Sequence, residues 1–408
     1  MFYSLPAAGS NISIRAILKA FKEWGLGSKV DARDILKDVA GPRYYLYLSS
    51  GRAALWLILR ALCQLRSRKQ EVIIPAYTCP AVVSAVLKAG LKPLLADINL
   101  TDFGLSIKDL NGKITADTLA VIVVHLFGYP ANIDEIQECC RDRKVFVIED
   151  AAQGFGNAVL DAPNKKLGLM GDAGVFSFGR GKPLNAMHGG ILVTNSEAIY
   201  EDAKKIYESI KHGSRFQYLK YFFMVGSYWA FSKPYLYWIP GGLPFLHLGE
   251  TSFERDFVIA KGDNFARAII DEIVSFLEED KGTRAKNSSW YASNLEGLPF
   301  VRTPPNPCFP YLRYPFMVED GRLRDGILKR LSSHGTGAAL FYPSPLNELP
   351  GLKEILKDSN CYPNAEKLSK MLITLPVHGG VKQSDRQRIK TITEQVIKDE
   401  CQPYVISH

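Results

Sequence analysis

Residues 120–150 of the chain read AVIVVHLFGYPANIDEIQECCRDRKVFVIED. Two runs rich in Val, Ile and Phe enclose a segment whose apolar spacing is that of a short helix. Runs that are apolar at nearly every position are typical of parallel strands buried on both faces, with the helix as the crossover between them. The stretch therefore predicts a strand–helix–strand unit of an α/β fold.

The same alternation extends outward, from about residue 44 to about residue 200. The apolar runs YYLYL, EVIIP and PLLADI precede the central unit, VFSF and GILVT follow it, and helical segments such as GRAALWLILRALCQL lie among them. This series predicts a sheet covered by helices on both faces. Ligands of such sheets bind beyond the carboxyl ends of the strands, so the residues after each run are candidates for a site.

The later part of the chain contains a proline-rich joint, LPFVRTPPNPCFP, at residues 298–310. We expect a large domain over residues 1–285, with an N-terminal arm and an aromatic insert at about 213–250. A smaller C-terminal α/β domain is expected over residues 286–408.

The composition is that of a soluble globular protein, because 47% of the 408 residues are hydrophobic and 23% are charged. Seven cysteines without regular spacing or a Cys/His cluster indicate reduced thiols in a cytoplasmic protein, with no metal site. The net charge of +8 suits phosphates and other anionic small molecules. No secretory signal and no nucleic-acid-binding motif is evident, so we expect a non-secreted protein without a nucleic-acid partner.

A turn of small residues follows the first expected strand. Ser49, Ser50 and Gly51 end YYLYL and open a helix. The N–H groups at the start of a helix, together with the helix dipole, form a ready phosphate site. Ser50 could equally be an N-cap with no ligand, and the turn alone does not decide between the two.

Two further polar residues end strands. Asp150 closes VFVIED, where its charge could hold a cationic ring nitrogen protonated, or where it could simply cap a helix. Ser177 lies between aromatic residues in VFSF, where it could bond a phosphate or a neighbouring backbone group.

Lys182 lies between two strand-like runs, after Gly179 and Gly181 and before Pro183. The glycines permit a tight turn and the proline stiffens its exit. A lysine at the edge of a buried sheet is partly desolvated, which makes its amine nucleophilic enough to form a Schiff base with an aldehyde. A lone lysine in a turn is more often solvated, so this assignment depends on the other motifs.

Taken in chain order, the motifs SSG, PAYTCPAV, VHLFG, EDAAQ, FSFGRGK and HGGILVT resemble those of the DegT/StrS group of sugar aminotransferases. The resemblance extends from SSGRAAL to LPVHGGVKQSDRQRI near the C-terminus. It implies the α/β fold of the fold-type-I enzymes, in which a mostly parallel seven-stranded sheet is covered by helices on both faces and a smaller C-terminal α/β domain follows. It also implies pyridoxal 5′-phosphate (PLP) as the cofactor and a homodimer with the active site at its interface.

The resemblance assigns roles around the cofactor ring. Lys182 would hold PLP as a Schiff base and shuttle the proton in catalysis. Asp150 would pair with the pyridine nitrogen, and Gln153 would lie near the phenolic oxygen. His125 would either pack beneath the ring or be a hydrogen-bonded core histidine.

The resemblance also assigns residues to a phosphate cup, and near this cup the chain departs from the family pattern. Ser50, Gly51 and Ser177 would form the cup. Arg52 replaces the common threonine and could still reach the phosphate. Cys79 occupies the place of an aromatic residue that stacks on the ring.

Further departures concern the ring and the substrate. Tyr77, two residues before the cysteine, is a possible substitute for the missing aromatic residue. His188 replaces an acidic residue before a glycine pair. Together with Arg180 and Tyr342, His188 is a candidate for substrate contact.

The larger departures affect the expected substrate rather than the cofactor. No Asn-x-Arg element, which related enzymes contribute across the dimer to the neighbour's phosphate, is found between His212 and Asn264. The family pattern HYPxPLH appears as FYPSPLN, so Phe341 and Asn347 replace two histidines.

The aromatic insert holds twelve aromatic residues between Phe216 and Phe245, beside the cations Arg215, Lys220 and Lys233. Ser232–Pro234 and Pro240 interrupt its apolar runs, which argues against a simple spanning helix. One interpretation is a dimer interface or a cover on the active site. The other is a hydrophobic ledge that lies on the inner membrane surface or grips a lipid-linked substrate.

The sequence thus predicts a PLP-dependent aminotransferase that transfers an amino group from an amino acid donor, such as glutamate, to a keto-sugar acceptor, expected to be nucleotide-linked. Such a reaction belongs to surface polysaccharide or amino-sugar biosynthesis. Two alternatives stay open. The acceptor could be a non-sugar or lipid-associated ketone, or the chain could be a PLP-binding sensor or scaffold without turnover.

Overall fold

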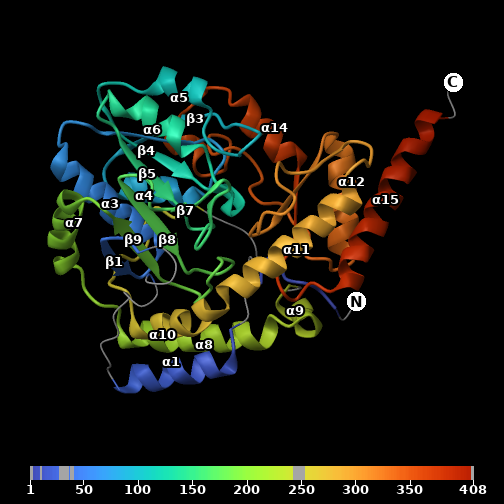
Figure 1. Cartoon of the computed structure of the whole chain (residues 1–408), viewed down its shortest axis with the longest axis horizontal. Helices are drawn as coiled ribbons and strands as arrows, with labels where there is room; N and C mark the ends of the chain where they lie inside the picture. Colours follow the sequence, from blue (N-terminus) through green and yellow to red (C-terminus); the bar gives the residue numbers. More distant parts are fainter. Residues whose placement is uncertain (1–2, 10–11, 27–35, 37–40, 242–252, 406–408) are drawn as a thin grey trace.

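The computed structural model describes residues 3–9, 12–26, 36, 41–241 and 253–405 (Figure 1). Its main sheet has seven strands in the order β1-β9-β8-β5-β4-β2-β3. The strands are β1 Tyr44–Leu48, β2 Glu71–Pro75, β3 Lys92–Ala96, β4 Thr118–Val124, β5 Phe146–Asp150, β8 Ala173–Ser177 and β9 Gly190–Thr194. The strands from β3 to β8 pair in parallel, whereas β9 is antiparallel to both β8 and β1. The predicted mostly parallel seven-stranded sheet is confirmed.

Helices cover both faces of this sheet (Figure 1). On one face pack α3 Gly51–Leu65 and α4 Pro80–Lys88, and on the other α5 Ile107–Lys113 and α6 Ile133–Arg141. The pleat of a strand sends successive side chains to opposite faces. In β2, Ile74 therefore joins the core beneath α3 and Ile73 joins the core beneath α6. Burial on both faces explains why these strands are apolar at nearly every position.

A further group of helices packs against strands β8 and β9. It contains α1 Ile14–Leu26, α8 Arg215–Phe231 and α10 Asn264–Ile273, while α7 Glu197–Ser209 packs on α3. Lys19 of α1 forms ion pairs with Asp271 and Glu272 of α10, at 3.2 and 3.4 Å.

The C-terminal part forms a separate small antiparallel sheet. Its strands are β10 Val301–Arg302, β11 Tyr314–Val318 and β12 Leu372–Leu375. The helices around it are α12 Gly321–Ser333, α13 Lys353–Leu356, α14 Pro363–Met371 and α15 Gln383–Val405. The expected boundary between residues 285 and 286 falls inside one continuous helix, α11 Leu277–Leu295, which runs from the large sheet toward the small one (Figure 1).

The remaining short elements lie in connections. They are the hairpin β6 Ala158–Val159 with β7 Ala162–Lys166, and the 3-10 turns η1 Leu126–Gly128 and η3 Val274–Phe276.

The aromatic insert is helical where it is described. Helix α8 ends at Phe231, and a second helix, α9 Pro234–Gly241, follows the interruption predicted at Ser232–Pro234. Residues 242–250 of the expected insert, with Phe245, lie outside the described residues, as do the side chains of residues 215–218. Across the described ranges, no helix combines the length and apolarity needed to cross a membrane.

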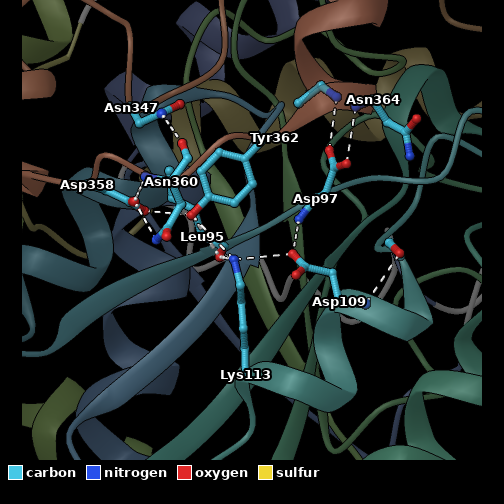
Figure 2. Close-up of polar contacts among 11 residues, drawn as sticks. Leu95, Asp97, Asp109, Lys113, Asn347, Asp358, Asn360, Tyr362 and Asn364 are labelled. Atoms are coloured by element: carbon cyan, nitrogen blue, oxygen red, sulfur yellow. Dashed lines mark hydrogen bonds and ion pairs between the residues drawn. The ribbon is translucent and has the colours of Figure 1, made fainter.

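A polar cluster joins the edge of the large sheet to the C-terminal part. We call it the inter-sheet clamp; it consists of Asp97, Asp109, Lys113, Tyr362 and Asn364 (Figure 2). The Asp97 carboxylate accepts hydrogen bonds from the first N–H groups of α14, those of Asn364 at 3.1 Å and Ala365 at 3.0 Å.

The rest of the clamp holds Asp97 in place. The Asp97 N–H donates to Asp109 at 2.6 Å, and Lys113 pairs with Asp109 at 3.2 Å. The same ammonium lies 4.5 Å from the centroid of the Tyr362 ring. The clamp therefore fixes the small sheet against strand β3.

Candidate functional site

The predicted site residues gather where β5 and β8 end and α3 and α4 begin. Asp150 is the last residue of β5 and pairs in register with Val124 of β4 and Val175 of β8. One carboxylate oxygen of Asp150 accepts a hydrogen bond from the Ala152 N–H at 3.0 Å. The Asp150 carboxylate is thus oriented by its own turn at the carboxyl edge of the sheet.

Lys182 lies in the turn between β8 and β9. Its N–H donates to the Gly179 carbonyl at 3.2 Å, and Gly181 has a φ of +76°, which a residue with a side chain rarely adopts. The Gly189 N–H donates to the Ser49 carbonyl at 2.8 Å, so the chain that carries Lys182 returns directly beside the start of α3. Gly181 thus has the structural role that the sequence predicts for it, whereas Gly179 is not in the left-handed region.

The Cys79 thiol shows that Lys182 and Asp150 share one site. Cys79 precedes the first residue of α4. Burial raises the pKa of this thiol, the nearby Lys182 ammonium opposes that rise, and the Asp150 carboxylate adds to it. Both charges act on the same thiol, one from the end of β5 and the other from the turn after β8.

A cradle for an anion lies at the start of α3. The Ser50 hydroxyl caps the helix by accepting a hydrogen bond from the Ala53 N–H at 3.1 Å, which leaves its hydrogen available for a ligand. A Cβ atom added to Gly51 would lie 2.8 Å from Cβ of Ser177, so only glycine fits there. Ser50 is an N-cap, as the simpler interpretation predicts, and the free N–H groups of the 15-residue helix point past it.

Arg52 does not point freely into this cradle. Its guanidinium pairs with Glu254 at 2.8 Å and lies 5.2 Å from the centroid of the Phe257 ring. The guanidinium also opposes the rise in the pKa of the Cys79 thiol, so it stays near the edge of the site. A phosphate contact from Arg52 would have to compete with the Glu254 carboxylate.

Tyr77 is held in place through its hydroxyl group. Its hydroxyl donates to the Tyr342 carbonyl at 3.0 Å and accepts from the Tyr342 N–H at 3.2 Å, and the residue is 1% exposed. Burial raises the pKa of Tyr342 well above its usual value, and the nearby Cys79 and Asp150 add to the rise. Tyr77 therefore positions Tyr342, whose hydroxyl reaches the Cys79 thiol beside Asp150.

His125 is a core histidine. Its Nδ1 accepts from the Ala131 N–H at 3.2 Å, so its Nε2 carries the hydrogen and donates to Glu149 at 2.8 Å. Glu149 also accepts from three backbone N–H groups and is fully buried. Because side chains alternate along β5, Glu149 and Asp150 point to opposite sides, and His125 follows Glu149 away from the site.

Gln153 is held by the loop after β4. Its amide oxygen accepts from the Phe127 N–H at 2.9 Å. With that oxygen used, the NH₂ group is the end of the side chain that can donate to a ligand.

His188 is engaged inside the protein rather than presented to a substrate. Its ring stacks on Tyr221 with centroids 3.6 Å apart, and its Nε2 bonds to Asp263. Burial acts to raise the pKa of Asp263, but the adjacent His188 prevails and lowers it. At 6% exposure, His188 is a packing residue, so the substrate contact predicted for it does not fit this structure. Arg180, in contrast, is exposed.

The two residues that replace family histidines have different surroundings. Phe341 packs on Phe127 with ring centroids 4.9 Å apart, next to the site. Asn347 donates from its amide to the Asn360 carbonyl at 3.1 Å, beside the inter-sheet clamp (Figure 2). Only the first of the two substitutions therefore changes the lining near Tyr342.

No motif in the sequence indicates Arg313, which is a lone arginine before β11. It is 8% exposed, and its guanidinium lies 5.7 Å from the centroid of the Phe341 ring. Burial lowers the pKa of its guanidinium, and Tyr237 of α9, Tyr342 and Tyr77 oppose that change. Arg313 and Tyr237 come together with the site only through the tertiary fold.

Two observations concern other kinds of site. Within the described ranges, no group of three His, Cys, Asp or Glu side chains could hold a metal ion. A cavity of about 1060 Å³ lies on the C-terminal part, lined by residues of α12 and α14 such as Arg322, Asp325 and Lys367. None of the predicted site residues lines it.

Known proteins similar to this chain include curated enzymes of sugar nucleotides. GDP-perosamine synthase of Escherichia coli O157:H7 is 36% identical over 159 residues, a match that covers 39% of this chain and 42% of that protein's length. UDP-N-acetyl-3-dehydro-alpha-D-glucosamine 3-aminotransferase of Acidithiobacillus ferrooxidans is 27% identical over 360 residues, or 88% of this chain and 86% of that protein.

Solved structures agree on the fold. The structure of NtdA from Bacillus subtilis with bound cofactor PMP superposes with a TM-score of 0.73 at 20% identity, over 95% of this chain and 83% of that chain. The model of the DegT/DnrJ/EryC1/StrS aminotransferase family matches residues 16–226 and 260–394, which include every predicted site residue. The chain belongs to the DegT/DnrJ/EryC1/StrS aminotransferase family.

Proposed function

We propose that this chain is a PLP-dependent aminotransferase that moves an amino group from an amino acid, with glutamate as the expected donor, to a nucleotide-linked keto sugar. The observation that carries the proposal is that Asp150 ends β5 beside β8, while Ser177 at the end of β8 packs against Gly51 and the turn with Lys182 returns to Ser49 at the start of α3. The family and the sugar-nucleotide enzymes among its relatives support the substrate class.

The residues present fit PLP. Helix N–H groups and the hydroxyls of Ser50 and Ser177, packed over Gly51, are donors suited to a phosphate. The carboxylate of Asp150 is suited to a protonated ring nitrogen, and the amine of Lys182 to an aldehyde. When bound, PLP would supply an electrophilic carbon and a ring that withdraws electrons from the substrate's reacting carbon.

The protein's own residues would then have distinct tasks. Lys182 would hold the cofactor covalently until the donor amine displaces it, and its freed Nζ would carry a proton from the donor's α-carbon to the cofactor carbon that bears the amino group. Asp150 would keep the ring nitrogen protonated through its charge. Tyr342, anchored by Tyr77, would close the side of the site next to Cys79.

The test uses the purified full chain loaded with PLP. The wild type should show the visible absorption of lysine-bound cofactor, lose it when glutamate is added, and regain it with the correct keto-sugar nucleotide. Lys182→Ala should lack this absorption and all amino transfer, whereas Lys205→Ala, which changes an exposed lysine paired with Asp202 on α7, should behave as wild type. Lysine-bound absorption that survives in Lys182→Ala would refute the proposal.

A PLP-binding sensor is the second candidate. The replacement of a family histidine by Phe341 next to the site favours it. In that case the colour of the bound cofactor would persist with glutamate and with every other amino acid donor tested.

We also propose that the chain forms a homodimer. Helices α1 and α8 expose large apolar side chains, among them Leu18 at 63% and Phe223 at 63%. Faces of this kind are typical of protein–protein contacts. The mass in solution, measured by light scattering, tests this directly, because a monomer at micromolar concentration would contradict it.

A further inference from the structure

The guanidinium of Arg313 is a buried group with donors left over. Its Nε and Nη2 atoms are buried, and the residues that the structure describes offer no hydrogen-bond partner to either. These two atoms form one edge of the guanidinium plane, and their two parallel N–H bonds match the two oxygens of a carboxylate. A buried cation without a counter-ion raises the free energy of the folded protein, so a negatively charged ligand group that faces this edge would be strongly bound.

The surroundings hold this edge in place. The guanidinium lies over the Phe341 ring, which packs on Phe127. The backbone next to it is tied to the same loop, because the Leu312 N–H donates to the Phe127 carbonyl at 2.8 Å. Phe127 in turn donates to Gln153 at 2.9 Å, so Arg313 is anchored to the rim of the site.

The groups that face Arg313 leave its charge unpaired. Its titratable neighbours include Tyr237, Tyr342 and Tyr77, and burial lowers the pKa of the guanidinium to about 10, which keeps it protonated at neutral pH. Its charge also contributes to the low pKa of His378, which is neutral. Among the described residues no carboxylate forms an ion pair with Arg313.

The position of Arg313 connects it to the reacting groups. The Phe341 ring, over which the guanidinium lies, also packs on the Tyr342 ring with centroids 4.4 Å apart, and the Tyr342 carbonyl accepts a hydrogen bond from Tyr77, two residues before Cys79. Burial raises the pKa of the Tyr237 hydroxyl in the insert, and the charges of Arg180 and Arg313 oppose that rise. Ring contacts therefore connect Arg313 to Tyr342 and to the loop that holds Gln153.

We propose that Arg313 is a specificity-determining residue whose Nε–Nη2 edge binds a carboxylate of the substrate. This inference rests on the proposed function and adds the requirement that a substrate carries a carboxylate. The carboxylate could belong to the amino acid donor or to an acidic sugar acceptor, and the two sources share the same recognition chemistry.

The first arm of the test measures donor-type carboxylates. Glutarate, which has no amino group and cannot react, is titrated calorimetrically into the PLP-loaded full chain. If the donor supplies the carboxylate, Arg313→Gln should weaken glutarate binding about 10- to 100-fold, as expected for the loss of a charge-assisted bidentate pair, and Arg313→Lys should fall between the two.

The second arm measures acceptor-type carboxylates. UDP-glucuronate and UDP-glucose differ by one carboxylate, and both are titrated into the same samples. If the sugar supplies the carboxylate, wild type should prefer UDP-glucuronate and Arg313→Gln should remove that preference. Equal weakening of both nucleotides would mean that Arg313 binds the diphosphate, and it would overturn the proposal.

Arg386→Gln is the matched control. Arg386 is also an almost buried arginine over an aromatic ring, 5.2 Å from the centroid of Trp290, but its Nη1 donates to Asn287 at 3.0 Å. This variant should lose stability and keep wild-type affinities. The melting temperature of Arg313→Gln shows whether this variant is folded. If it is folded and has unchanged affinity for glutarate and an unchanged preference between the nucleotides, the proposal is overturned.

The outcomes separate this inference from the function. Glutarate binding that depends on Arg313, in a protein that transfers no amino group, would refute the aminotransferase proposal alone. Amino transfer by the wild type, combined with carboxylate binding that does not depend on Arg313, would refute the carboxylate site alone.

Discussion

Asp97 and Asp150 have nearly the same setting in the sequence and opposite surroundings in the structure. Each closes an apolar run, PLLAD or VFVIED, at the carboxyl end of a parallel strand. Both oxygens of Asp97 accept hydrogen bonds from the start of α14 (Figure 2), whereas the described residues give the Asp150 carboxylate a single hydrogen bond, from Ala152 in its own turn.

The difference teaches how to recognise a functional polar group. A carboxylate whose acceptors are used by the protein contributes to stability, and one whose acceptors are left over is available to a ligand. The inter-sheet clamp and the candidate site can therefore be told apart by substitutions, because stability should depend on the first and activity on the second.

The largest expected effect comes from Asp150→Asn. Without the carboxylate charge the ring nitrogen of PLP would lose its proton, so we expect the rate of amino transfer to fall by about 100-fold or more, in the range seen when one electrostatic stabiliser is removed. The melting temperature should hardly change, because the side chain can keep its contact with Ala152. Steady-state kinetics with glutamate measures the rate, and near wild-type activity would remove Asp150 from the catalytic proposal.

The second effect comes from Asp97→Ala, which tests the other half of the comparison. The variant loses two charge-assisted hydrogen bonds to the N-terminus of α14, so the free energy of unfolding should fall by about 2–3 kcal/mol. Urea denaturation measures the loss. Asp97→Asn, which keeps one acceptor, should lose less, and the activity of the folded fraction should be that of wild type in both variants.

The smallest effect concerns His378, which joins the N-terminal arm to the C-terminal part. Its Nε2 donates to the Pro6 carbonyl at 3.0 Å, and its Nδ1 accepts from the Gly380 N–H at 3.1 Å. Burial lowers the pKa of His378 to about 4, against an ordinary value of 6.5. Protonation of Nδ1 would also break the bond from Gly380, so the folded protein keeps this ring neutral.

The sign of the resulting pH dependence follows from linkage. Below pH 6.5 the unfolded chain takes up a proton at His378 that the folded chain does not bind until about pH 4, so this contribution is complete above pH 6.5 and is lost as the pH falls toward 4. Between pH 7 and pH 5.5 we expect a loss of about 1 kcal/mol. Urea denaturation at both pH values, with His378→Gln as the control, isolates it; an equal pH slope in the two proteins would contradict the assignment.

Much of the fold could be predicted because its signals are local. Runs such as AVIVV and VFVIE are buried on both faces, which makes every position apolar and marks parallel strands without knowledge of their partners. The chemistry around Lys182 is local in the same sense, since Gly179, Gly181 and the lysine belong to one turn.

Two predicted site residues have partners that are remote in the sequence. The hydroxyl of Tyr77 bonds to the backbone of Tyr342, 265 positions away. His188 was expected at the substrate, yet Asp263, 75 positions away, takes its Nε2. No pattern in the neighbourhood of either residue indicates these partners.

By itself, the sequence determined the order of strands and helices, the family, and the turn that carries Lys182, because hydrophobic periodicity and backbone turns depend on adjacent residues. Only the tertiary structure decided that the carboxylate oxygens of Asp97 accept hydrogen bonds from α14, while the carboxylate of Asp150 is available to a ligand. It also decided that the Nε–Nη2 edge of Arg313 has no hydrogen-bond partner among the described residues. Whether a buried polar group has a partner depends on segments that are brought together from across the chain. A buried polar group with a protein partner contributes to stability, and one without a partner is available to a ligand.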